Sequence, residues 1–393
     1  MAKELEEEYY RLPKDDFSRL LDSIRKNPQT IHFFGDSSTP YFFLSDPAAT
    51  KVLLQLHSDN WEFESLFKSF SKFGQTQLIQ SFLIREIEST NGIENIHSTR
   101  HDIFTFMQRN TTGKDKKLIS ILNGYSTLLK DGIRSPSDLH ELRDLYDLFF
   151  KGAIEKEDRP DGTYFRKGPV FITNGLKNVH RGFFPEEAVN NAMNEFLGLY
   201  NDQQKDLFER LILSHFLIET VHPFYDGNGR FGRFLFTQKY FEETGSYLAF
   251  SVSAALNRRK SSYYKALDEA RHEHMYGSLN AYFGDIAEIL HLYTDELNHE
   301  LREKKERIET TVFSKKDFTV SERKILQLLA ESTLLSDFGI SNAEILENTS
   351  VSKRTLISSM QRFRELKLLE ETKFSRTVYH KLREMVTTQK ISS

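Results

Sequence analysis

Hydrophobic residues recur every three or four positions along most of this chain, which is the spacing of an amphipathic helix. The pattern predicts helices at 52–56, 63–82, 118–129, 139–150, 185–200, 229–243, 259–274 and 279–307. Between 202 and 220 the apolar side is broad, and it carries Leu207, Phe208, Leu211, Ile212, His215, Phe216 and Ile218. The fold class predicted from this pattern is mainly α.

One segment departs from the helical spacing. Residues 162–173 are rich in aromatic and β-branched side chains and contain Gly168-Pro169 near their middle. This composition is typical of two short strands joined by a turn, so we predict a hairpin here. A further turn is predicted at Asn174-Gly175.

Residues 314–393 show a different order of elements. Helices are predicted at 321–331, with Ser321 as the cap, at 342–348 and at 352–366, and two strands follow at 368–372 and 376–380. Three helices followed by a hairpin resemble a small winged helix-turn-helix domain, in which basic side chains meet DNA phosphates. The candidates for that contact are Lys353, Arg354, Arg362 and Arg364.

The positive charge of this segment is modest, with 14 Lys and Arg residues against 10 Asp and Glu residues. A DNA-binding protein neutralises many phosphates, so a larger excess is usual. Many modules of this shape serve instead as packing or dimerisation elements. DNA binding and a structural role both stay open on the sequence alone.

The chain has 393 residues, which exceeds one ordinary hydrophobic core, so we expect more than one domain. The net charge of −4 gives the whole chain no bias toward nucleic acid. The absence of cysteine excludes disulfides and thiolate chemistry. The chain has no run of about 18 apolar residues, and its first residues are acidic. We therefore expect neither a membrane span nor secretion, and a cytoplasmic location.

The strongest chemical signal lies at residues 222–233, which read His-Pro-Phe-Tyr-Asp-Gly-Asn-Gly-Arg-Phe-Gly-Arg. A proline disfavours helical geometry in the residue before it, so the preceding helix should end near Val221 or His222. Gly227 and Gly229 let the backbone turn sharply and approach a ligand closely. The next helix is predicted to begin at about Gly229, where free N–H groups and the helix dipole favour a phosphate.

Charged side chains of the same stretch suit a nucleotide. Arg230 and Arg233 stand three residues apart on one helical face, and two guanidinium groups suit a polyphosphate. Asp226 is a hard oxygen ligand for Mg²⁺. His222, with a reference pKa of about 6.5, suits a base that takes a proton from an attacking hydroxyl. Together these features indicate phosphoryl or nucleotidyl transfer.

This stretch resembles the Fic motif, His-x-Phe-x-(Asp/Glu)-Gly-Asn-Gly-Arg-x-x-Arg, at every specified position. The resemblance implies a helical Fic core that binds ATP with Mg²⁺ and transfers AMP to a protein hydroxyl, with release of pyrophosphate. It assigns the base to His222, the Mg²⁺ ligand to Asp226 and the γ-phosphate contact to Arg233. It further implies a loop anchor at Phe224 and ATP-phosphate contacts from Gly227, Asn228, Gly229 and Arg230.

The resemblance also bears on the type of reaction. In the related Doc kinases a lysine stands at the point of the motif that Gly229 occupies here, and the nucleotide binds in an altered orientation. The intact glycine therefore favours transfer of AMP over transfer of phosphate.

Residues 90–95 read Thr-Asn-Gly-Ile-Glu-Asn and resemble the family's inhibitory signature, (Ser/Thr)-x-x-x-Glu-(Gly/Asn). Their position before the catalytic motif is that of the family's second class. The resemblance implies that Glu94 pairs with Arg233 and blocks the γ-phosphate, because one guanidinium cannot bind two anions in one geometry. Thr90 and Asn95 complete the predicted inhibitory site.

The resemblance implies two further sites. The predicted hairpin is similar to the family's flap, which adds a segment of the target protein as a strand. The docking candidates on the flap are Phe165, Val170, Phe171 and Ile172. Residues 257–264 are similar to the stretch that closes over the adenine, where the candidates are Asn257 and Tyr264.

We therefore predict an N-terminal helical region with the inhibitory helix at 1–110, a Fic catalytic core at 111–313 and a winged-helix-like domain at 314–393. The predicted function is a protein adenylyltransferase that is inhibited by Glu94 and acts on Ser, Thr or Tyr of a target protein. Self-modification and a homodimer are further options. Two alternatives stay open, a DNA-binding regulator that senses nucleotides and a Fic enzyme that also removes AMP.

Overall fold

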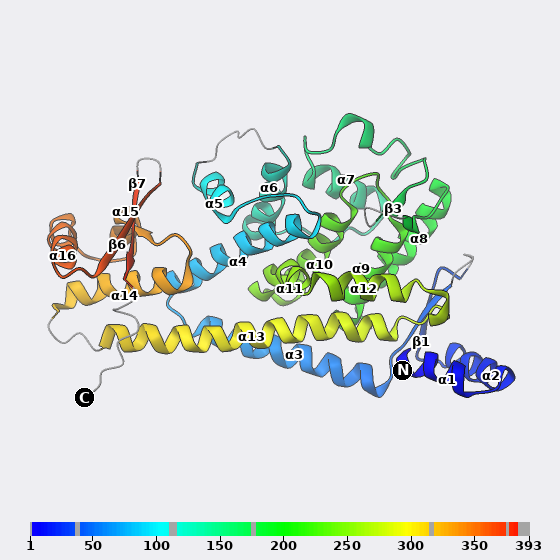
Figure 1. Cartoon of the computed structure of the whole chain (residues 1–393). Helices are drawn as coiled ribbons and strands as arrows, with labels where there is room; N and C mark the ends of the chain where they lie inside the picture. Colours follow the sequence, from blue (N-terminus) through cyan, green and yellow to red (C-terminus); the bar gives the residue numbers. More distant parts are fainter. Residues whose placement is uncertain are drawn as a thin grey trace. The chain divides into compact units, whose positions relative to one another are not determined.

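The computed structural model describes residues 2–35, 40–109, 116–173, 178–313, 318–374 and 377–383 (Figure 1). Helices make up most of the described chain, and the strands form small antiparallel sheets. The prediction of a mainly α fold is confirmed. None of the described helices has the length and the apolar character needed to cross a membrane.

The chain divides into two compact units. Unit 1 comprises Met1–Asn60 and Arg85–Tyr293, and unit 2 comprises Trp61–Ile84 and Thr294–Ser393. Helices α3 (Pro47–Lys68), α4 (Lys72–Ile93) and α13 (Asn280–Phe313) run across these borders. The predicted division into three domains groups the residues differently and stays a prediction.

Unit 1 is built around α9 (Leu207–Val221) and α10 (Asn228–Thr244), which pack against each other (Figure 1). Every residue of α9 is buried, including the charged side chains of Arg210 and Glu219. This helix begins later than the predicted 202, because Asp206 caps its first turn by accepting a hydrogen bond from the N–H of Phe208. The predicted end of α10 is confirmed, since Gly245 follows it in the left-handed conformation.

The other elements of unit 1 confirm most of the predicted helices and add a strand pair that the sequence analysis missed. The helices are α1 (Ala2–Arg11), α2 (Lys14–Arg25), α5 (Arg100–Arg109), α6 (Lys116–Asp131), α7 (Leu139–Phe149), α8 (Glu186–Tyr200), α11 (Val252–Arg258) and α12 (Lys260–Ala270). The added strands, each four residues long, are β1 (Thr30–Phe33) and β2 (Tyr41–Leu44). Single turns of 3₁₀ helix lie at Lys156–Asp158, Tyr247–Ser251 and Glu273–Met275.

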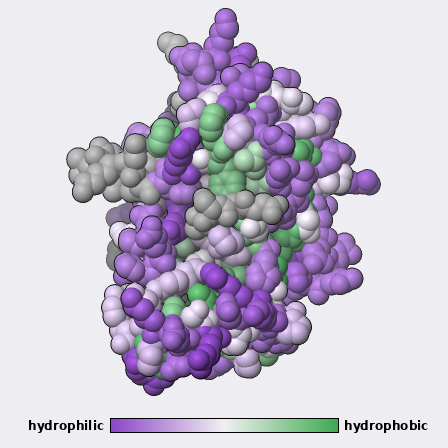
Figure 2. Space-filling view, turned by 90° about the vertical axis from the view of Figure 1, so that its right-hand side faces the viewer, coloured by the Kyte–Doolittle hydropathy of each residue, from purple (hydrophilic) through white to green (hydrophobic). Residues whose placement is uncertain are grey.

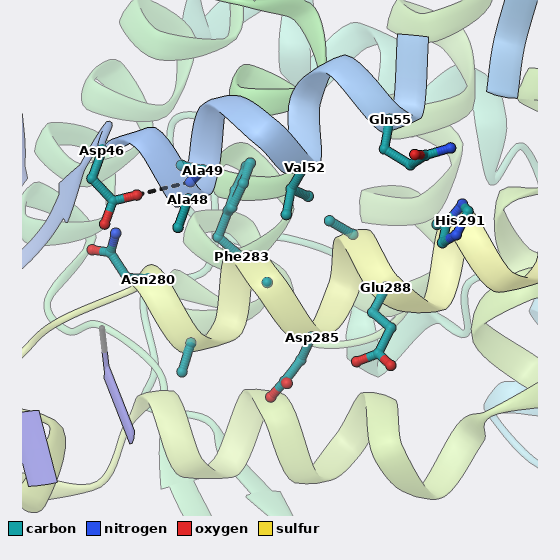
Figure 3. Close-up of a pocket in the computed structure, with 13 residues that line it drawn as sticks. Asp46, Ala48, Ala49, Val52, Gln55, Asn280, Phe283, Asp285, Glu288 and His291 are labelled. Atoms are coloured by element: carbon teal, nitrogen blue, oxygen red, sulfur yellow. Dashed lines mark hydrogen bonds between the residues drawn. The ribbon is translucent and has the colours of Figure 1, made fainter. Parts of the chain in front are cut away.

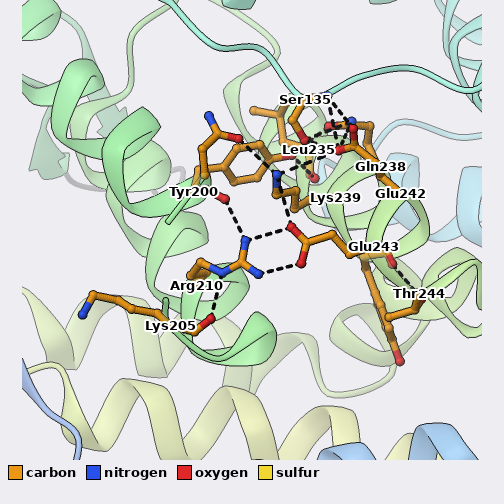
Figure 4. Close-up of polar contacts among 12 residues, drawn as sticks. Ser135, Tyr200, Lys205, Arg210, Leu235, Gln238, Lys239, Glu242, Glu243 and Thr244 are labelled. Carbon is orange, nitrogen blue, oxygen red and sulfur yellow. Dashed lines mark hydrogen bonds and ion pairs between the residues drawn. The ribbon is translucent and has the colours of Figure 1, made fainter. Parts of the chain in front are cut away.

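A polar network holds the second half of α10 against α8 and α9 (Figure 4). The buried guanidinium of Arg210 binds both carboxylate oxygens of Glu243, at 2.9 and 2.6 Å. The hydroxyl of Tyr200 donates to the side chain of Gln238 at 2.8 Å, and the ammonium of Lys239 lies 3.2 Å from Glu243. Bidentate pairing of this kind is strong and directional, so α10 is firmly placed.

The periodic stretch 63–82 does not form the single helix that was predicted. The structure ends α3 at Lys68 and begins α4 at Lys72. The hydroxyl of Ser71 accepts a hydrogen bond from the N–H of Gly74 at 3.0 Å, which is the contact of a helix N-cap. The apolar spacing continues across this break, so periodicity alone does not reveal it.

The hairpin lies later in the chain than predicted. Strand β3 (Phe171–Thr173) pairs with β4 (Asn178–Arg181), so Gly168-Pro169 precedes the hairpin and does not form its turn. The predicted turn at Asn174-Gly175 falls outside the described residues.

The segment before the hairpin forms no strand because its N–H groups have other partners. The N–H groups of Tyr164 and Phe165 bind the carboxylate of Glu186, at 2.9 and 3.1 Å. The N–H of Arg166 donates to the carbonyl of Pro223 at 3.2 Å. These contacts tie the segment to α8 and to the turn between α9 and α10.

The C-terminal part of unit 2 follows the predicted order of three helices and a hairpin, with one extra strand. Its elements are α14 (Val320–Leu335), β5 (Ile340–Ser341), α15 (Asn342–Glu347), α16 (Lys353–Glu365), β6 (Leu369–Phe374) and β7 (Thr377–Leu382). Strand β7 lies between β5 and β6. The cap of α14 is Thr319 and not the predicted Ser321, because Thr319 and Glu322 form a reciprocal capping box. The comparison with a winged helix stays a prediction.

Residues from the α3–α4 junction belong to unit 2 because they pack on its core. Phe73 joins the buried cluster formed by the helices and strands from α14 to β7. The hydroxyl of Ser71 also donates to the carboxylate of Glu331 at 2.6 Å. The sequence pattern did not indicate this connection between two distant segments.

Candidate active site

The turn between α9 and α10 begins where the sequence predicts. Helix α9 ends at Val221, and His222 follows in the left-handed conformation with φ 54°. Few residues other than glycine adopt this geometry, which sharply ends the helix before Pro223. Gly227 is also left-handed, with φ 82°, and stands at the N-cap of α10.

Phe224 anchors this turn. Its side chain is completely buried and stacks on Tyr146 with the ring centres 3.6 Å apart. The side chain of Asn228 donates to the carbonyl of Phe224 at 2.8 Å and accepts from its N–H at 2.9 Å. The amide group of Asn228 therefore closes the loop, and the predicted contact of Asn228 with a phosphate would fall to its backbone N–H.

Arg230 and Asp226 face each other across the first turn of α10. The guanidinium Nη2 of Arg230 lies 3.2 Å from the carboxylate of Asp226, and the group lies over the ring of Phe150. Its Nε is buried and has no hydrogen-bond partner within the described residues. A buried donor without an acceptor is costly, so Arg230 fits a site that receives an anionic ligand.

Asp226 is the carboxylate at this turn that suits a metal ion. Its side chain is 37% exposed, and one of its oxygens accepts a hydrogen bond from the N–H of Gly227 at 2.6 Å. In the part of the chain that the structure describes, no group of three or more His, Asp or Glu residues is arranged so that it could hold a metal ion. Mg²⁺ needs few protein ligands when phosphate oxygens and water complete its shell. The donor set therefore fits Mg²⁺ bound together with a nucleotide.

His222 is neutral at physiological pH. Burial of the imidazole, together with the positive charge of Arg271, lowers the pKa of His222 to about 3. Its Nδ1 is buried and makes no hydrogen bond within the described residues. A neutral imidazole accepts a proton, so the ionisation state of His222 fits a general base.

Arg233 is buried and binds the end of α4. Its Nη2 lies 2.7 Å from the carboxylate of Glu94, and its Nε donates to the hydroxyl of Thr90 at 3.0 Å. The predicted contact between Glu94 and Arg233 is therefore present, although 139 positions separate the two residues. A Cβ at Gly229 would collide with Oε1 of Glu94. The carboxylate thus lies over the start of α10, where a helix favours an anion.

The sequence model of the Fic/DOC family matches residues 136–238, which contain the turn and both arginines. These residues form a Fic/DOC family domain. The matched range includes neither residues 90–95 nor residues 257–264. A search of curated proteins finds no match to the chain.

Two solved structures of Fic proteins are similar to this chain. A Fic family protein from Desulfovibrio desulfuricans G20 superposes with a TM-score of 0.53 at 18% identity, over 88% of this chain and 98% of that chain. Fic-1 from C. elegans (residues 134–508) gives a TM-score of 0.47 at 15% identity, over 63% of this chain and 72% of that chain. The first of these similarities shows a shared fold.

The adenine candidates lie beside the predicted inhibitory segment, residues 90–95. The hydroxyl of Tyr264 donates to the carbonyl of Ile93 at 3.0 Å, and the side-chain amide of Asn257 packs against Gly92. Lys260, which the sequence analysis did not single out, donates to the carbonyl of Gly92 at 2.9 Å and to the side chain of Asn95 at 2.8 Å. The role of Asn257 and Tyr264 toward adenine stays a prediction.

The flap candidates differ in their exposure. Phe165 is completely buried, packs on Phe224 and stands before the hairpin, so its side chain does not face a target. Val170 is partly buried, Phe171 is exposed, and the side chain of Ile172 lies outside the described residues. Among the flap candidates with a described side chain, Phe171 is therefore the one that is open to a partner.

Phe171 belongs to an exposed group that includes two residues the sequence analysis missed. The guanidinium of Arg181 lies over the rings of Phe171 and Phe184, and both rings are about half exposed. Strand β3 lies toward the right side of Figure 1, and Figure 2 shows that side, where hydrophobic residues gather among hydrophilic ones. An aromatic pair around one cation suits contact with another chain.

Sequence reasoning also missed a buried carboxylate on α4. Glu86 accepts hydrogen bonds from the N–H and hydroxyl of Ser253, at 2.8 and 2.5 Å, and from the hydroxyl of Tyr125 at 3.2 Å. Burial, which these hydrogen bonds oppose, raises the pKa of Glu86 to about 6. The sequence contained a signal, because Glu86, Thr90 and Glu94 stand four residues apart on one helical face.

Glu219 is a second buried carboxylate that was missed. It stands three residues before His222, and its Oε1 has no hydrogen-bond partner within the described residues. Burial, opposed by the charge of Arg233, raises the pKa of Glu219 to about 7. No local pattern distinguishes this glutamate from an ordinary residue of a core helix.

A cavity of about 480 Å³ lies apart from these residues, between α3 and α13 (Figure 3). Small and apolar side chains such as Ala49, Val52 and Phe283 line it, with Glu288 and His291 at one end. None of the residues predicted for ATP, metal or target binding lines this cavity. The residues predicted to carry the chemistry therefore lie at the turn between α9 and α10 and not at this cavity.

Proposed function

We propose that this chain transfers AMP from ATP to a hydroxyl side chain of a target protein and that Glu94 inhibits the transfer. The observation that carries the proposal is the ion pair between Glu94 and Arg233 over Gly229. A carboxylate stands at a helix N-terminus beside a buried guanidinium, which is a site that suits a phosphate. The same turn carries the neutral imidazole of His222.

In this proposal His222 takes the proton of the target hydroxyl. The hydroxyl oxygen forms a bond to the α-phosphorus of ATP, while the bond from that phosphorus to the oxygen that bridges to the β-phosphate breaks. Pyrophosphate leaves with the electron pair of that bond. The N–H groups at the start of α10 and the guanidinium of Arg230 stabilise the negative charge on the phosphates.

The proposed cofactor is Mg²⁺, which Asp226 would hold and which would supply further neutralisation of phosphate charge. Arg233 would bind the γ-phosphate once Glu94 has left it. The Fic/DOC domain supports this reading, since its family generally transfers nucleotidyl groups to proteins. Gly229 supports AMP as the transferred group, as the resemblance to the Fic motif implies.

Labelling with ATP that carries the label on its α-phosphate tests the proposal. The purified chain is incubated with labelled ATP, Mg²⁺ and a protein extract, and label is measured on the extract proteins and on the chain itself. We expect Glu94→Gly to raise labelling about tenfold or more over the unmodified chain, because Arg233 becomes free. No label on any protein with the Glu94→Gly chain would overturn the proposal.

Two controls separate the chemistry from a general loosening of α4. Adding His222→Ala to the Glu94→Gly chain should abolish labelling, because the base is lost. Glu88→Gly alters the same helix at a residue that pairs with Arg100, and it should leave labelling unchanged. Equal activation by both glycine substitutions would mean that a loosened helix, and not the freed Arg233, raises activity.

No specific observation favours the alternatives. Arg362 and Arg364, two of the four basic residues predicted to meet DNA, are held in ion pairs with Glu322 and Glu371 at 2.9 Å. DNA binding therefore stays a prediction that depends mainly on Lys353 and Arg354. Removal of AMP also stays a prediction, and the labelling assay detects it as loss of label from a protein modified beforehand.

A further inference from the structure

Arg166 is a buried arginine whose guanidinium binds backbone carbonyls. Its side chain is completely buried, and no ion pair within the described residues involves it. Its Nε donates to the carbonyl of His222 at 2.8 Å, its Nη1 to that of Gly168 at 2.6 Å and its Nη2 to that of Phe183 at 2.8 Å. A longer contact of 3.3 Å joins Nη2 to the carbonyl of Val221. Burial lowers the pKa of Arg166 to about 10, so the group is still charged at neutral pH.

The end of α9 explains why a guanidinium is stable here without a carboxylate. The last carbonyls of a helix lack partners within the helix, and they form the negative end of its dipole. Arg166 supplies a cation and N–H groups to the carbonyls of Val221 and His222. The N–H of Phe183 donates to Val221 at 3.0 Å, and Nε2 of His180 donates to the carbonyl of Thr220 at 2.8 Å. Arg166 before the flap, and His180 and Phe183 at its other end, therefore cap α9, which ends directly before His222.

Arg166 binds the backbone on both sides of the flap. Gly168 precedes β3 and Phe183 follows β4, so the guanidinium joins the two ends of the hairpin. The chain after β4 also passes directly against the base. A Cβ at Gly182 would stand 2.6 Å from Nη2 of Arg166 and 3.1 Å from the Cβ of His222.

We propose that Arg166 is a positioning residue that sets the distance between the flap and His222, so that a target strand docked on the flap presents its hydroxyl to the imidazole. The inference rests on the proposed function. Proton transfer needs the hydroxyl within hydrogen-bond reach of the base, and small errors in placement cost much of the rate. A single planar group with several N–H donors can bridge three chain segments, whereas an ammonium group presents one nitrogen atom.

The test compares Arg166→Lys with Arg210→Lys, both in the Glu94→Gly chain. Arg210 is also a buried arginine of unit 1 that binds backbone carbonyls, but it stands at the other end of α9 and does not contact the flap. Two reactions are measured, transfer of AMP to the protein that the Glu94→Gly chain labels, and transfer of AMP to water. Water needs no docking on the flap, so it reports on ATP binding and on His222.

We expect Arg166→Lys to lower the ratio of protein labelling to ATP hydrolysis about tenfold, because the flap is no longer held at a fixed distance from His222. Arg210→Lys should change this ratio less than twofold, even if it lowers thermal stability as much. An equal fall in both reactions with Arg166→Lys would mean that the arginine supports the fold alone, and this outcome would overturn the inference. An unchanged ratio would also overturn it.

Gly182→Ala provides a second variant in case Arg166→Lys does not fold. Its methyl group pushes the end of β4 away from Arg166 and His222 without removing a charge. It should lower the same ratio, and an unchanged ratio would contradict the inference.

Hydrogen exchange separates this inference from the proposed function. The N–H groups of Gly182 and Phe183 donate to the carbonyls of Val170 and Val221. They should exchange faster in Arg166→Lys than in Arg210→Lys, whether or not AMP is transferred. If the Glu94→Gly chain transfers no AMP, the proposed function is refuted. Faster exchange in Arg166→Lys would then still preserve the structural link between Arg166 and the flap. Unchanged exchange would refute the link itself.

Discussion

Burial disfavours the charged forms of both His222 and Arg233, but the net pKa shifts of the two groups are opposite. It lowers the pKa of His222 to about 3, so the imidazole carries no charge. It also opposes the charge of Arg233, but the interactions with Glu94, Tyr263 and Glu219 together outweigh this effect and raise the pKa of that guanidinium above its ordinary value. A buried cation without a counter-ion is strongly destabilised, so Arg233 needs a replacement anion when Glu94 leaves. A phosphate of ATP meets that need in the proposed reaction.

The pH dependence of AMP transfer should reflect the low pKa of His222. A base with the ordinary pKa of about 6.5 would be mostly protonated at pH 5 and would lose about 97% of its active form. With a pKa of about 3, the imidazole is still neutral at pH 5. We therefore expect the single-turnover rate of the Glu94→Gly chain to stay within about threefold between pH 8 and pH 5. A decrease with a midpoint near pH 6.5 would contradict this.

At the scale of the element, contacts at successive turns of α4 hold the segment that leads to Glu94, the residue proposed to inhibit transfer. Glu86 binds Ser253 of α11, Thr90 binds Arg233 of α10, and Glu94 binds the same arginine. Glu86 and Thr90 lie on one face of α4, and Glu94 follows directly after its last residue, Ile93. The position of Glu94 therefore depends on the last two turns of α4 and not on the contact of Glu94 alone.

Substitution of Glu86 should weaken both the fold and the inhibition. Glu86→Ala leaves the N–H of Ser253 and the hydroxyl of Tyr125 without their acceptor in the core. We expect the free energy of unfolding to fall by about 3 kcal/mol, as measured by urea unfolding. Labelling without the Glu94 substitution should rise, but less than with Glu94→Gly.

The matched control is Glu88→Ala on the same helix. Glu88 is partly exposed and pairs with Arg100, so its loss should cost less than about 1 kcal/mol. If Glu86→Ala changed stability no more than Glu88→Ala does, Glu86 would not anchor the helix.

The flap shows how a pattern within an element can mislead. Residues 162–170 have the composition of a strand, yet the carboxylate of Glu186 takes the N–H groups of Tyr164 and Phe165. The strands form a few residues later, at β3 and β4. Strand composition describes a half-buried segment and does not reveal which partner binds its backbone.

At the scale of the whole molecule, folding changes the proton affinity of several buried groups. Burial lowers the pKa of His215 to about 3 and that of His180 to about 4. In the unfolded chain these histidines have an ordinary pKa of about 6.5. The unfolded state therefore takes up protons first as the pH falls, and each such histidine makes the folded state less stable below pH 6.5.

His215→Gln should reduce this pH dependence. His215 contributes stability that is fully present above pH 6.5 and is lost as the pH falls toward 3, which amounts to about 2 kcal/mol between pH 7.5 and pH 5. Glutamine does not titrate, so the variant should lose about that much less over the same interval. Urea unfolding followed by circular dichroism at both pH values measures the difference.

The unmodified chain serves as the reference for that experiment. Glu86 and Glu219, whose raised pKa values act in the opposite direction, are present in both proteins and cancel in the comparison. Equal pH dependence of the two proteins would show that His215 is not held neutral by the fold.

By itself, the sequence determined the mainly helical fold and the turn geometry of residues 222–233. Local preferences are sufficient for this turn, because Pro223 ends one helix, Gly227 permits a left-handed bend and the charged residues stand within a few positions of one another. The backbone geometry of a contiguous motif is determined mainly by the residues of the motif itself.

Only the tertiary structure decided which distant groups complete the site. The ion pair between Glu94 and Arg233 had a sequence signature. The placement of the Glu94 carboxylate against Gly229, however, depends on how α4 packs against α10. The contacts of Arg166 had no signature at all, because a guanidinium that binds carbonyl groups recognises backbone and not particular side chains. Such contacts arise only when whole helices and the flap have come together.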